Sequence, residues 1–410
     1  MTDDASVIRA RAAAVMDAGA VLRSSTSEER AGWLAGAAEA LGNAAYQRRL
    51  ELSDTTGLSV AMVDWATRTT LCTVQEDAML ALVRSARRDM NGATDPVALL
   101  SAVLAGNVFT ASVRGVVVPL LFGVPVLVKA SSRETVFPDM LRDALRSTDS
   151  GLGAAMDLVV FPGGDRERDA ALVESAETVS VYGSDETVAA LTSRFGDRPV
   201  IGHGHGVSVA YCGAGACDGA HLANTIEKLS LDICAYDQRG CLSPQLVYVE
   251  EASGRSAAAF AQRLIDEGLN LMGRTLPRGP LPDAVGAAQA QWRGMAEVEG
   301  ALVLGDNCAV SVRAPQPIRW SPAYRNVAVA PVRGVDDALQ SMRSIGPHLK
   351  CVGADAGSLP EVGSRLAESP TITAYACALG EMQTPPLDAP ADGLPIWHGL
   401  FRASKAGKTN

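Results

Sequence analysis

The chain up to Pro96 carries the pattern of α-helices. Ala, Leu, Arg and Glu dominate this part, and it contains no earlier proline. The residues from Thr26 to Glu29 fit a capping box, in which a hydroxyl and a carboxylate each accept from a backbone N–H group at a helix start. The pattern therefore predicts a helical N-terminal part, with one helix beginning after Thr26.

From about Leu99 onward, short apolar runs alternate with polar residues that favour helix starts. Val113–Val128 is expected to hold short buried strands with a helix between them. Asp157–Phe161 and Thr178–Tyr182 are each expected to be one buried strand followed by a helix. Strands that alternate with helices in this way predict an open, parallel α/β sheet.

A glycine-rich stretch interrupts the pattern, with six glycines between Ile201 and Gly219, and it is predicted to be a hinge or domain boundary. A second α/β pattern follows it. Leu246–Val249 and Asn326–Ala330 are expected to be strands, and Ser256–Glu267 is expected to be a helix. At roughly 150 residues per domain, a chain of 410 residues has room for two or three domains.

Composition narrows the class of protein. With 47% hydrophobic and 20% charged residues, the chain has the balance of a folded globular protein. A net charge of -10 and 5% aromatic residues argue against nucleic-acid partners and anionic lipid. No apolar run is long enough for a transmembrane helix, and the acidic N-terminus does not resemble a signal peptide. We expect a cytoplasmic protein whose eight cysteines are thiols rather than a disulfide framework.

The strongest candidate for chemistry is Cys241, which follows Gly240 and precedes a predicted strand. On such a tight loop we expect the thiol to be exposed and the backbone N–H group to be able to donate a hydrogen bond. A cysteine thiolate there has the character of a nucleophile for a carbonyl or thioester carbon. The alternative is an inert, buried cysteine, which is the commoner state of this residue type.

Other segments offer binding groups, each with a plainer alternative. Asn107 offers a side-chain N–H₂ donor, or else it is a turn residue. Lys129 ends an apolar run, where it meets either an anion or solvent. Gly183 and Ser184 follow a strand, where their N–H groups suit a phosphate, or where Ser184 simply caps a helix.

Taken in order, these segments resemble the aldehyde dehydrogenase superfamily, and within it the bacterial long-chain acyl-CoA reductases that supply fatty aldehyde for bioluminescence. The resemblance covers roughly residues 100 to 400 and is carried by Gly106–Phe109, Gly123–Ser132, Val181–Ser184, Ala235–Gln245, and Gly380–Gln383 with Pro385, Pro386 and Asp392-Gly393. The resemblance implies that Cys241 is the nucleophile. It also implies that Asn107 and the Cys241 N–H group form an oxyanion hole, and that Lys129, Ser131, Gly183 and Ser184 contact a dinucleotide.

Two departures from the superfamily pattern refine these expectations. Relatives that prefer NAD usually carry a glutamate three residues after the lysine, where this chain has Ser132, followed by Arg133. Serine and arginine accommodate a 2′-phosphate that a carboxylate would repel, which favours NADPH over NADH. The second departure is that Ile201–Ser208 holds no carboxylate in place of the hydrolytic general base. This absence favours reduction of a thioester over oxidation of an aldehyde to a free acid.

Histidines in the same stretch leave two questions open. His203 or His205 is a candidate acid or base near neutral pH, without a choice between them, and both also fit a polar loop with no chemistry. Together with Cys212, Cys217 and His221 they are residue types that bind zinc, but their spacing matches no known finger. We therefore expect no metal site, and we expect Cys234 to be a structural residue.

The sequence thus predicts an aldehyde dehydrogenase-like α/β fold with two open, twisted sheets. Residues 1–205 are expected to form the dinucleotide-binding domain and residues 206–370 the catalytic domain. Residues 371–410 are expected to pack back on the first domain or on a neighbouring subunit. The expected activity is NADPH-dependent reduction of an acyl thioester to an aldehyde through a Cys241 thioester. The acyl donor is an acyl-CoA or a carrier-bound thioester, a partner protein for acyl transfer is conceivable, and a homo-oligomer is expected. A semialdehyde dehydrogenase, an acyl-phosphate reductase and a non-catalytic scaffold are the alternatives.

Overall fold

The computed structural model describes residues 3–90, 95–196, 198–251 and 256–402, and these form two compact units. The first unit takes in the chain up to Thr56, the chain from Asp64 to His205, and the chain from Pro386 onward. The second unit takes in Gly57–Val63 and Gly206–Pro385. The main crossing between the units therefore falls within the glycine-rich stretch.

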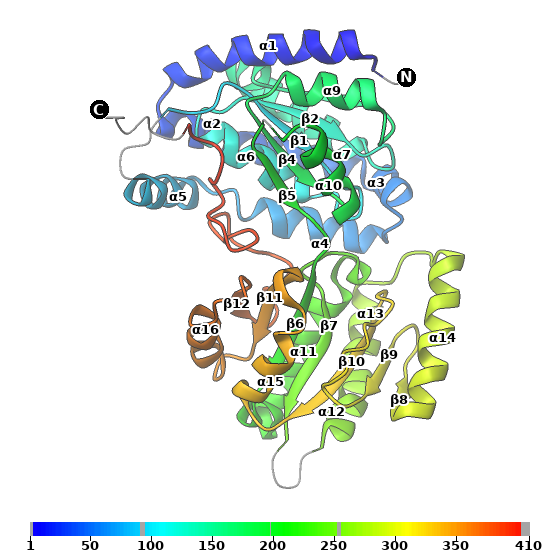
Figure 1. Ribbon diagram of the computed structural model, residues 1–410. Coiled ribbons are helices and arrows are strands. Elements are labelled where there is room, and N and C mark those ends of the chain that lie inside the picture. The colour runs from blue at the N-terminus through cyan, green and yellow to red at the C-terminus, as the bar shows by residue number, and fades with distance from the viewer. Residues whose placement is uncertain (1–2, 91–94, 197, 252–255, 403–410) are drawn as a thin grey trace. The chain divides into compact units, whose positions relative to one another are not determined.

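Helices precede the sheet of the first unit and then alternate with its strands (Figure 1). Its elements are α1 (Ala5–Ser24), α2 (Ser27–Gln47), α3 (Arg49–Thr56), α4 (Val60–Leu71, which belongs to this unit from Asp64), α5 (Glu76–Asp89), β1 (Leu100–Val103), α6 (Ala111–Leu121), β2 (Val126–Ala130), α7 (Val136–Thr148), α8 (Ser150–Ala154), β3 (Met156–Val160), α9 (Arg166–Glu174), β4 (Thr178–Tyr182), α10 (Asp185–Arg194) and β5 (Val200–His203).

The five strands of this unit form a fully parallel sheet in the order β3-β2-β1-β4-β5. Helices α1 and α9 pack against one face of it, where Ile8 and Val15 of α1 join a buried apolar cluster (Figure 1). The chain builds outward from β1 to β3 on one side and then returns to the other side of β1 with β4. The strand order therefore reverses between β1 and β4, and such a switch point is where open α/β sheets bind ligands.

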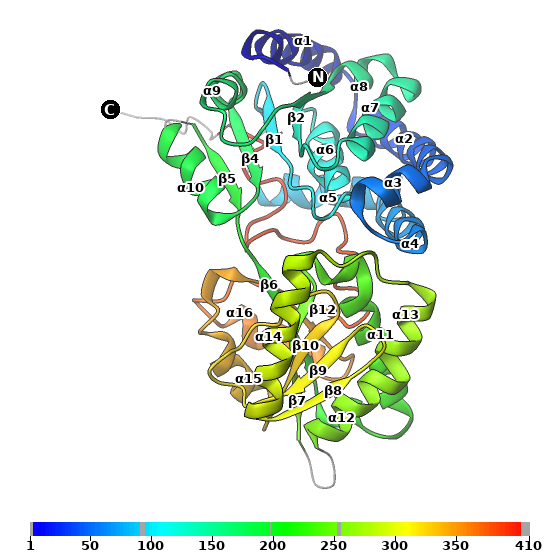
Figure 2. The same ribbon diagram turned by 90° about the vertical axis from the view of Figure 1, so that its right-hand side faces the viewer.

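The second unit repeats the α/β plan with a larger sheet (Figure 2). Its elements are β6 (Val207–Cys212), the 3₁₀ turn η1 (Ala214–Cys217), α11 (Gly219–Cys234), the turn η2 (Ala235–Gln238), β7 (Pro244–Glu250), α12 (Ala257–Arg263), the π-helix η3 (Leu264–Leu269), α13 (Asn270–Thr275), α14 (Asp283–Glu299), β8 (Ala301–Leu304), β9 (Ala309–Val312), β10 (Asn326–Val332), α15 (Val335–Met342), the 3₁₀ turn η4 (Gly346–His348), β11 (Leu349–Ala354), α16 (Leu359–Ala367) and β12 (Tyr375–Ala378).

Seven strands form this sheet in the order β12-β11-β6-β7-β10-β9-β8, and only the β8–β9 pair is antiparallel within the described residues. One buried cluster joins α11, α12 and η3 to one face of the sheet. A second cluster joins α14, α15 and α16 to the other face. Here the strand order reverses between β6 and β11, which is the second switch point of the chain.

The predicted fold class is confirmed, and most of the expected elements are present. The capping box at Thr26 and Glu29 closes in both directions. Strands β3, β4, β7 and β10 cover the runs that were expected to be strands. The prediction for Val113–Val128 was wrong in part, because this run holds one strand, β2, preceded by helix α6. Most residues of α6 are buried, so its apolar run lacks the polar face that marks a surface helix.

The C-terminal segment behaves in two ways. Residues 371–385 include β12, which joins the sheet of the second unit. From Pro386 on, the chain packs on the first unit, where Arg402 forms ion pairs with Asp95 and Glu177 and where Phe401 meets Phe122 edge-on. The part that returns to the first unit therefore starts later than the expected residue 371. None of the described helices is long and apolar enough to cross a membrane.

Candidate active site

Cys241 lies on an exposed loop at the amino end of β7. Its carbonyl oxygen accepts a hydrogen bond from the Ser208 hydroxyl at 2.8 Å, which ties the loop to the start of β6. The Gln238 side chain donates to the Pro244 carbonyl at 2.8 Å, which closes the loop across Cys241. The loop thus holds a thiol at the surface while its backbone is fixed on both sides.

An unusual turn precedes this loop. Tyr236, Asp237 and Gln238 all have left-handed φ angles, at 51°, 53° and 59°. Left-handed backbone costs roughly 1–2 kcal/mol for each residue with a side chain. Three such residues in a row persist only where the surrounding structure holds them, and strain of this kind concentrates at functional sites.

A buried ion pair holds the turn. The Asp237 carboxylate accepts from Arg325 at 2.7 and 3.2 Å, and the two side chains are 1% and 2% exposed. The other oxygen of Asp237 accepts from the Gly279 N–H group. Arg325 ends a second left-handed turn that begins at Ala323. Two strained turns are therefore clamped to each other directly before the candidate nucleophile.

A second acidic side chain, on α11, holds a segment that contacts the same loop. Asp232 is fully buried and accepts from the N–H groups of Gly380 (2.6 Å) and Met382 (3.1 Å). Burial raises the pKa of Asp232 to about 8, although these two hydrogen bonds act in the opposite direction. Gln383 belongs to the segment that Asp232 holds. Its side-chain oxygen accepts a long hydrogen bond from the hydroxyl of Ser243, two residues after Cys241.

In the first unit, the remaining candidates follow the carboxyl ends of the strands. Asn107 is exposed on the loop after β1, and Lys129 is the fourth residue of β2. Gly183 and Ser184 follow β4, and His203 ends β5. Because parallel strands end at one edge of the sheet, all these residues lie along that edge, on both sides of the switch point between β1 and β4.

Lys129 is buried rather than solvated, with an exposed fraction of 8%. Its ammonium group lies 4.8 Å from the centre of the Phe161 ring. Burial lowers the pKa of Lys129, while the Asp169 carboxylate acts to raise it. The structure thus excludes the alternative of a strand end surrounded by water.

The next residues form a tight turn that packs against the Asn107 loop. A side chain at Gly106 would bring its Cβ within 2.6 Å of the Ser131 hydroxyl, so a larger residue here would require Ser131 to move. Ser132 and Arg133 are exposed on the turn. Glu134 ends the turn and is only 4% exposed. Burial raises the pKa of its carboxyl group to about 7.

The turn after β4 fits a phosphate less well. Ser184 caps α10 by accepting from the Thr187 N–H group at 3.3 Å. The next two residues, Asp185 and Glu186, are acidic. Two carboxylates in the first turn of a helix oppose a phosphate at the same place. Ser184 therefore has the plainer role of a helix cap, and a pyrophosphate there would meet negative charge.

The structure distinguishes the two candidate histidines. His203 stacks on Tyr182 with ring centres 4.3 Å apart, and its Nδ1 lies 2.7 Å from an Asp392 oxygen. A carboxylate on Nδ1 fixes the orientation of the ring and leaves Nε2 for proton exchange. His205 is exposed, and its backbone N–H group donates to Asp185. Of the two histidines, His203 is therefore the stronger candidate for an acid or base.

Several residues of this arrangement were missed by sequence reasoning. Asp392 belongs to a segment that carried the resemblance, so its sequence context was a signal. Asp237 lies four residues before Cys241 and could have been singled out in the same way. Nothing in the sequence marked Arg325 or Asp232, since each acts through contacts between segments that are distant in the chain.

The other cysteines lie apart from this chemistry. Cys234 is fully buried at the end of α11, as expected, and burial raises its pKa to about 12. Cys212 and Cys217, which were candidates for zinc, are both buried, the first at the end of β6 and the second in η1. Among the described residues, no group of three or more His, Cys, Asp or Glu is arranged to hold a metal ion.

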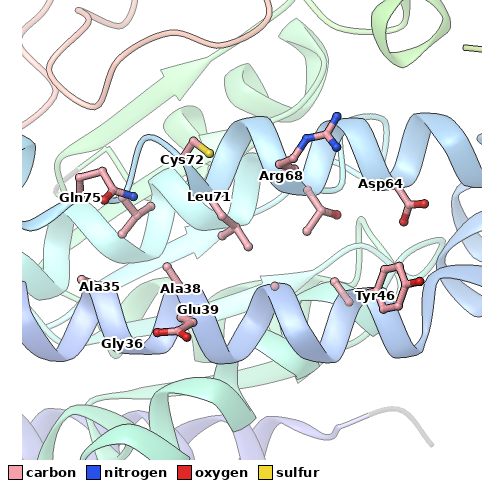
Figure 3. A pocket seen from close by; sticks show the side chains of 14 residues that line it. Ala35, Gly36, Ala38, Glu39, Tyr46, Asp64, Arg68, Leu71, Cys72 and Gln75 are labelled. Atoms are coloured by element: carbon pink, nitrogen blue, oxygen red, sulfur yellow. The ribbon is translucent and has the colours of Figure 1, made fainter. Parts of the chain in front are cut away.

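A pocket of about 670 Å³ lies apart from these residues, between α2 and α4 of the first unit (Figure 3). Its floor is formed by small residues such as Ala35, Gly36 and Ala38, with Arg68 and Asp64 at the opposite wall. None of the residues that line it is a candidate from the sequence. We assign no chemistry to this pocket.

Solved structures define the fold. Aldehyde dehydrogenase 21 from Physcomitrella patens is 17% identical with a TM-score of 0.72, and the match covers 96% of this chain and 86% of that one. An oxidoreductase from Marinobacter aquaeolei is 14% identical with a TM-score of 0.74, over 96% and 86% of the two chains. Lactaldehyde dehydrogenase from Escherichia coli is 16% identical with a TM-score of 0.68, over 92% and 84%. At these identities the likeness establishes the aldehyde dehydrogenase fold and no more.

The family follows from the sequence itself. Residues 33–402 match the model of the family described as acyl-CoA reductase (LuxC), which is most of the chain. The chain therefore belongs to the acyl-CoA reductase (LuxC) family of oxidoreductases, and the predicted resemblance is confirmed. No curated protein matches the chain in sequence.

Proposed function

We propose that this enzyme reduces an acyl thioester to an aldehyde with NADPH, through a thioester on Cys241. The observation that carries the proposal is the loop of Cys241. A strained turn and a buried ion pair present one exposed thiol, although an ordinary structural cysteine needs neither. Acyl-CoA and carrier-bound thioesters share the carbonyl chemistry that such a thiol attacks.

The first step is transfer of the acyl group. The Cys241 thiolate attacks the thioester carbonyl, the bond to the donor sulfur breaks, and the donor leaves as a thiol after taking up a proton. The Asn107 amide and the Cys241 N–H group are the proposed donors to the oxyanion, each commonly worth about 3 kcal/mol. Because Asn107 belongs to the first unit and Cys241 to the second, a double substitution at these two positions tests whether they act together.

The second step releases the aldehyde. A nicotinamide cofactor, when bound, supplies the hydride that reduces the acyl group. The C–S bond to Cys241 then breaks, and the thiolate is regenerated. His203 is proposed to exchange the proton, with Asp392 holding its ring. The overall change consumes one thioester, one NADPH and one proton, and it yields aldehyde, free thiol and NADP⁺.

The residues after β2 fit the phosphorylated ribose of NADPH. Lys129 brings a buried positive charge, and Ser132 and Arg133 are exposed where NAD-preferring relatives place a carboxylate. The glycine at position 106 lets the Asn107 loop close onto this turn. The acidic start of α10 fits a pyrophosphate less well, which supports the turn after β2 as the main binding place in this proposal.

The test is NADPH absorbance followed over time with a panel of acyl-CoAs, with free thiol counted in parallel. Loss of NADPH matched by released CoA supports the proposal and gives the preferred chain length. NADPH loss with an acyl phosphate but with no acyl-CoA would contradict it and favour an acyl-phosphate reductase. Failure to bind any nicotinamide cofactor would favour a non-catalytic scaffold.

A further inference from the structure

The glycine-rich loop of the second unit has no part in the chemistry proposed above. It runs from Gly213, directly after β6, to Gly219, the first residue of α11. Glycines stand at its first, third and seventh positions. A strand, a loop with closely spaced glycines and a helix form the fingerprint of nucleotide-binding α/β units, here with the third glycine one position later.

This loop lies at the switch point of its sheet. Gly213 follows β6 and Asp355 follows β11, the two neighbouring strands between which the order reverses. A cavity of about 540 Å³ opens there, which is within the usual size range of small-molecule sites. Cys241 precedes β7, whereas the cavity is lined by Glu250 at the other end of β7. At 3.3 Å per residue the two places are about 20 Å apart.

The floor of the cavity presents two oriented carboxylates. Glu250 accepts from the Tyr211 hydroxyl at 2.8 Å and from the Ala214 N–H group at 3.3 Å, both through one oxygen. Asp355 accepts from the N–H groups of Gly213 (2.8 Å), Gly357 (3.0 Å) and Ser358 (3.1 Å). Carboxylates fixed by backbone donors are suited to accept hydrogen bonds from the hydroxyl groups of a ribose.

The wall of the cavity has the opposite character. His221, Asn224 and Lys228 line it from one face of α11, and all three are exposed. The first turn of α11 contains no acidic residue. Since Asp355 already occupies the Gly213 N–H group, a phosphate in this cavity would be bound by Lys228 and His221.

The glycines shape the space between floor and wall. A Cβ at Gly213 would come within 2.2 Å of the Ser358 hydroxyl, so a larger residue here would require Ser358 to move. A Cβ at Gly215 would meet nothing within 4 Å. Gly215 therefore borders open space, where a ligand can approach the backbone closely.

We propose that this cavity is a second nucleotide site, which binds a ribonucleotide with its ribose hydroxyls on Glu250 and Asp355 and its phosphate on Lys228 and His221. It is separate from the cofactor residues of the first unit. The proposal does not depend on the acyl chemistry, and its test uses no acyl substrate.

The test is the binding of 5′-AMP to the full chain, measured by titration calorimetry in a Lys129→Ala background that weakens the first unit's site. Adenosine and 2′-deoxy-AMP are titrated in parallel. We expect 5′-AMP to bind at least about tenfold more tightly than either, because adenosine lacks the phosphate and 2′-deoxy-AMP lacks one ribose hydroxyl. No binding of 5′-AMP at millimolar concentration, or equal binding of all three, would overturn the proposal.

Variants assign the contacts. Lys228→Ala should make 5′-AMP bind no better than adenosine, and Glu250→Gln should remove the preference over 2′-deoxy-AMP. Gly215→Val should block binding without disturbing the fold, because its side chain enters open space. Arg343→Ala, which removes an exposed charge elsewhere in the same unit, is the matched control and should bind normally. Binding that survives both Lys228→Ala and Gly215→Val would contradict the assignment.

Discussion

Five strands of the second sheet repeat the strand order of the first sheet, but the two sheets differ in which end of the strands carries the candidate residues. In the first unit the candidate cofactor residues follow the carboxyl ends of β1 and β2, beside the switch point. In the second unit Cys241 lies at the amino end of β7, and the switch point carries the glycine loop and cavity instead. Strand order alone therefore locates the candidate site of the first unit but not the proposed nucleophile, which follows a strained turn held by a buried ion pair.

The largest effect is expected at the nucleophile itself. Cys241→Ala should lower acyl-CoA reduction at least about a thousandfold, because it removes the sulfur on which the thioester is proposed to form. Cys72, the other exposed cysteine among the described residues, lies in the first unit and provides the control. Cys72→Ala should keep its activity in the NADPH assay. Equal losses of activity in both variants would contradict a special role for the cysteine of the second unit.

The turn before Cys241 is expected to contribute strongly to stability. Asp237→Ala leaves the Arg325 guanidinium buried without its partner and should lower the free energy of unfolding by about 3–5 kcal/mol. Asp337→Ala breaks the exposed Arg333 pair in the same unit and should cost less than about 0.5 kcal/mol. Urea unfolding of both variants measures the contrast. A small loss for Asp237→Ala would mean that the clamp does not hold the turn.

The proposed preference for NADPH over NADH can be tested by placing a negative charge in the first unit. Ser132→Glu places a carboxylate where a 2′-phosphate is proposed to bind, and it should lower kcat/KM for NADPH relative to NADH by roughly tenfold or more. Ser193→Glu adds the same charge at an exposed position of α10 and should leave the ratio unchanged. An unchanged ratio for Ser132→Glu would place the adenosine ribose elsewhere.

Each unit also contains a buried acid whose titration should appear in the pH dependence of stability. Burial raises the pKa of Glu134 in the first unit from 4.5 to about 7, and that of Asp232 in the second from 3.8 to about 8. The folded chain keeps a proton that the unfolded chain releases. The stabilisation is therefore complete below the unfolded values and is lost as the pH rises to the folded ones.

The two acids are distinguished by the pH at which the loss ends. Glu134→Gln should reduce the loss in the free energy of unfolding that occurs up to about pH 7. Asp232→Asn should reduce the loss that continues up to about pH 8. We expect each reduction to be about 1–3 kcal/mol. Urea unfolding from about pH 5 to about pH 9 checks this. A decline that both variants retain would assign the pH dependence to other groups.

Much of the fold was readable from local pattern, because buried parallel strands such as β3 and β4 are short apolar runs that end at helix-starting residues. Helix α6 was partly misread, since a helix buried on most sides has an equally continuous apolar run. The sequence singled out Cys241, Asn107 and Lys129 as candidates because each lies in one of the motifs that carry the resemblance. The contacts of Arg325 with Asp237 and of Asp392 with His203 were not predicted, since each joins distant positions that only the tertiary structure brings together.

The most direct test of the account is the intact mass of the protein after mixing with an acyl-CoA in the absence of NADPH. The account predicts one added acyl group on Cys241, absent from Cys241→Ala and discharged as aldehyde when NADPH is added. An acyl group that appears equally on Cys241→Ala, or reduction that proceeds in that variant, would contradict a thioester on Cys241.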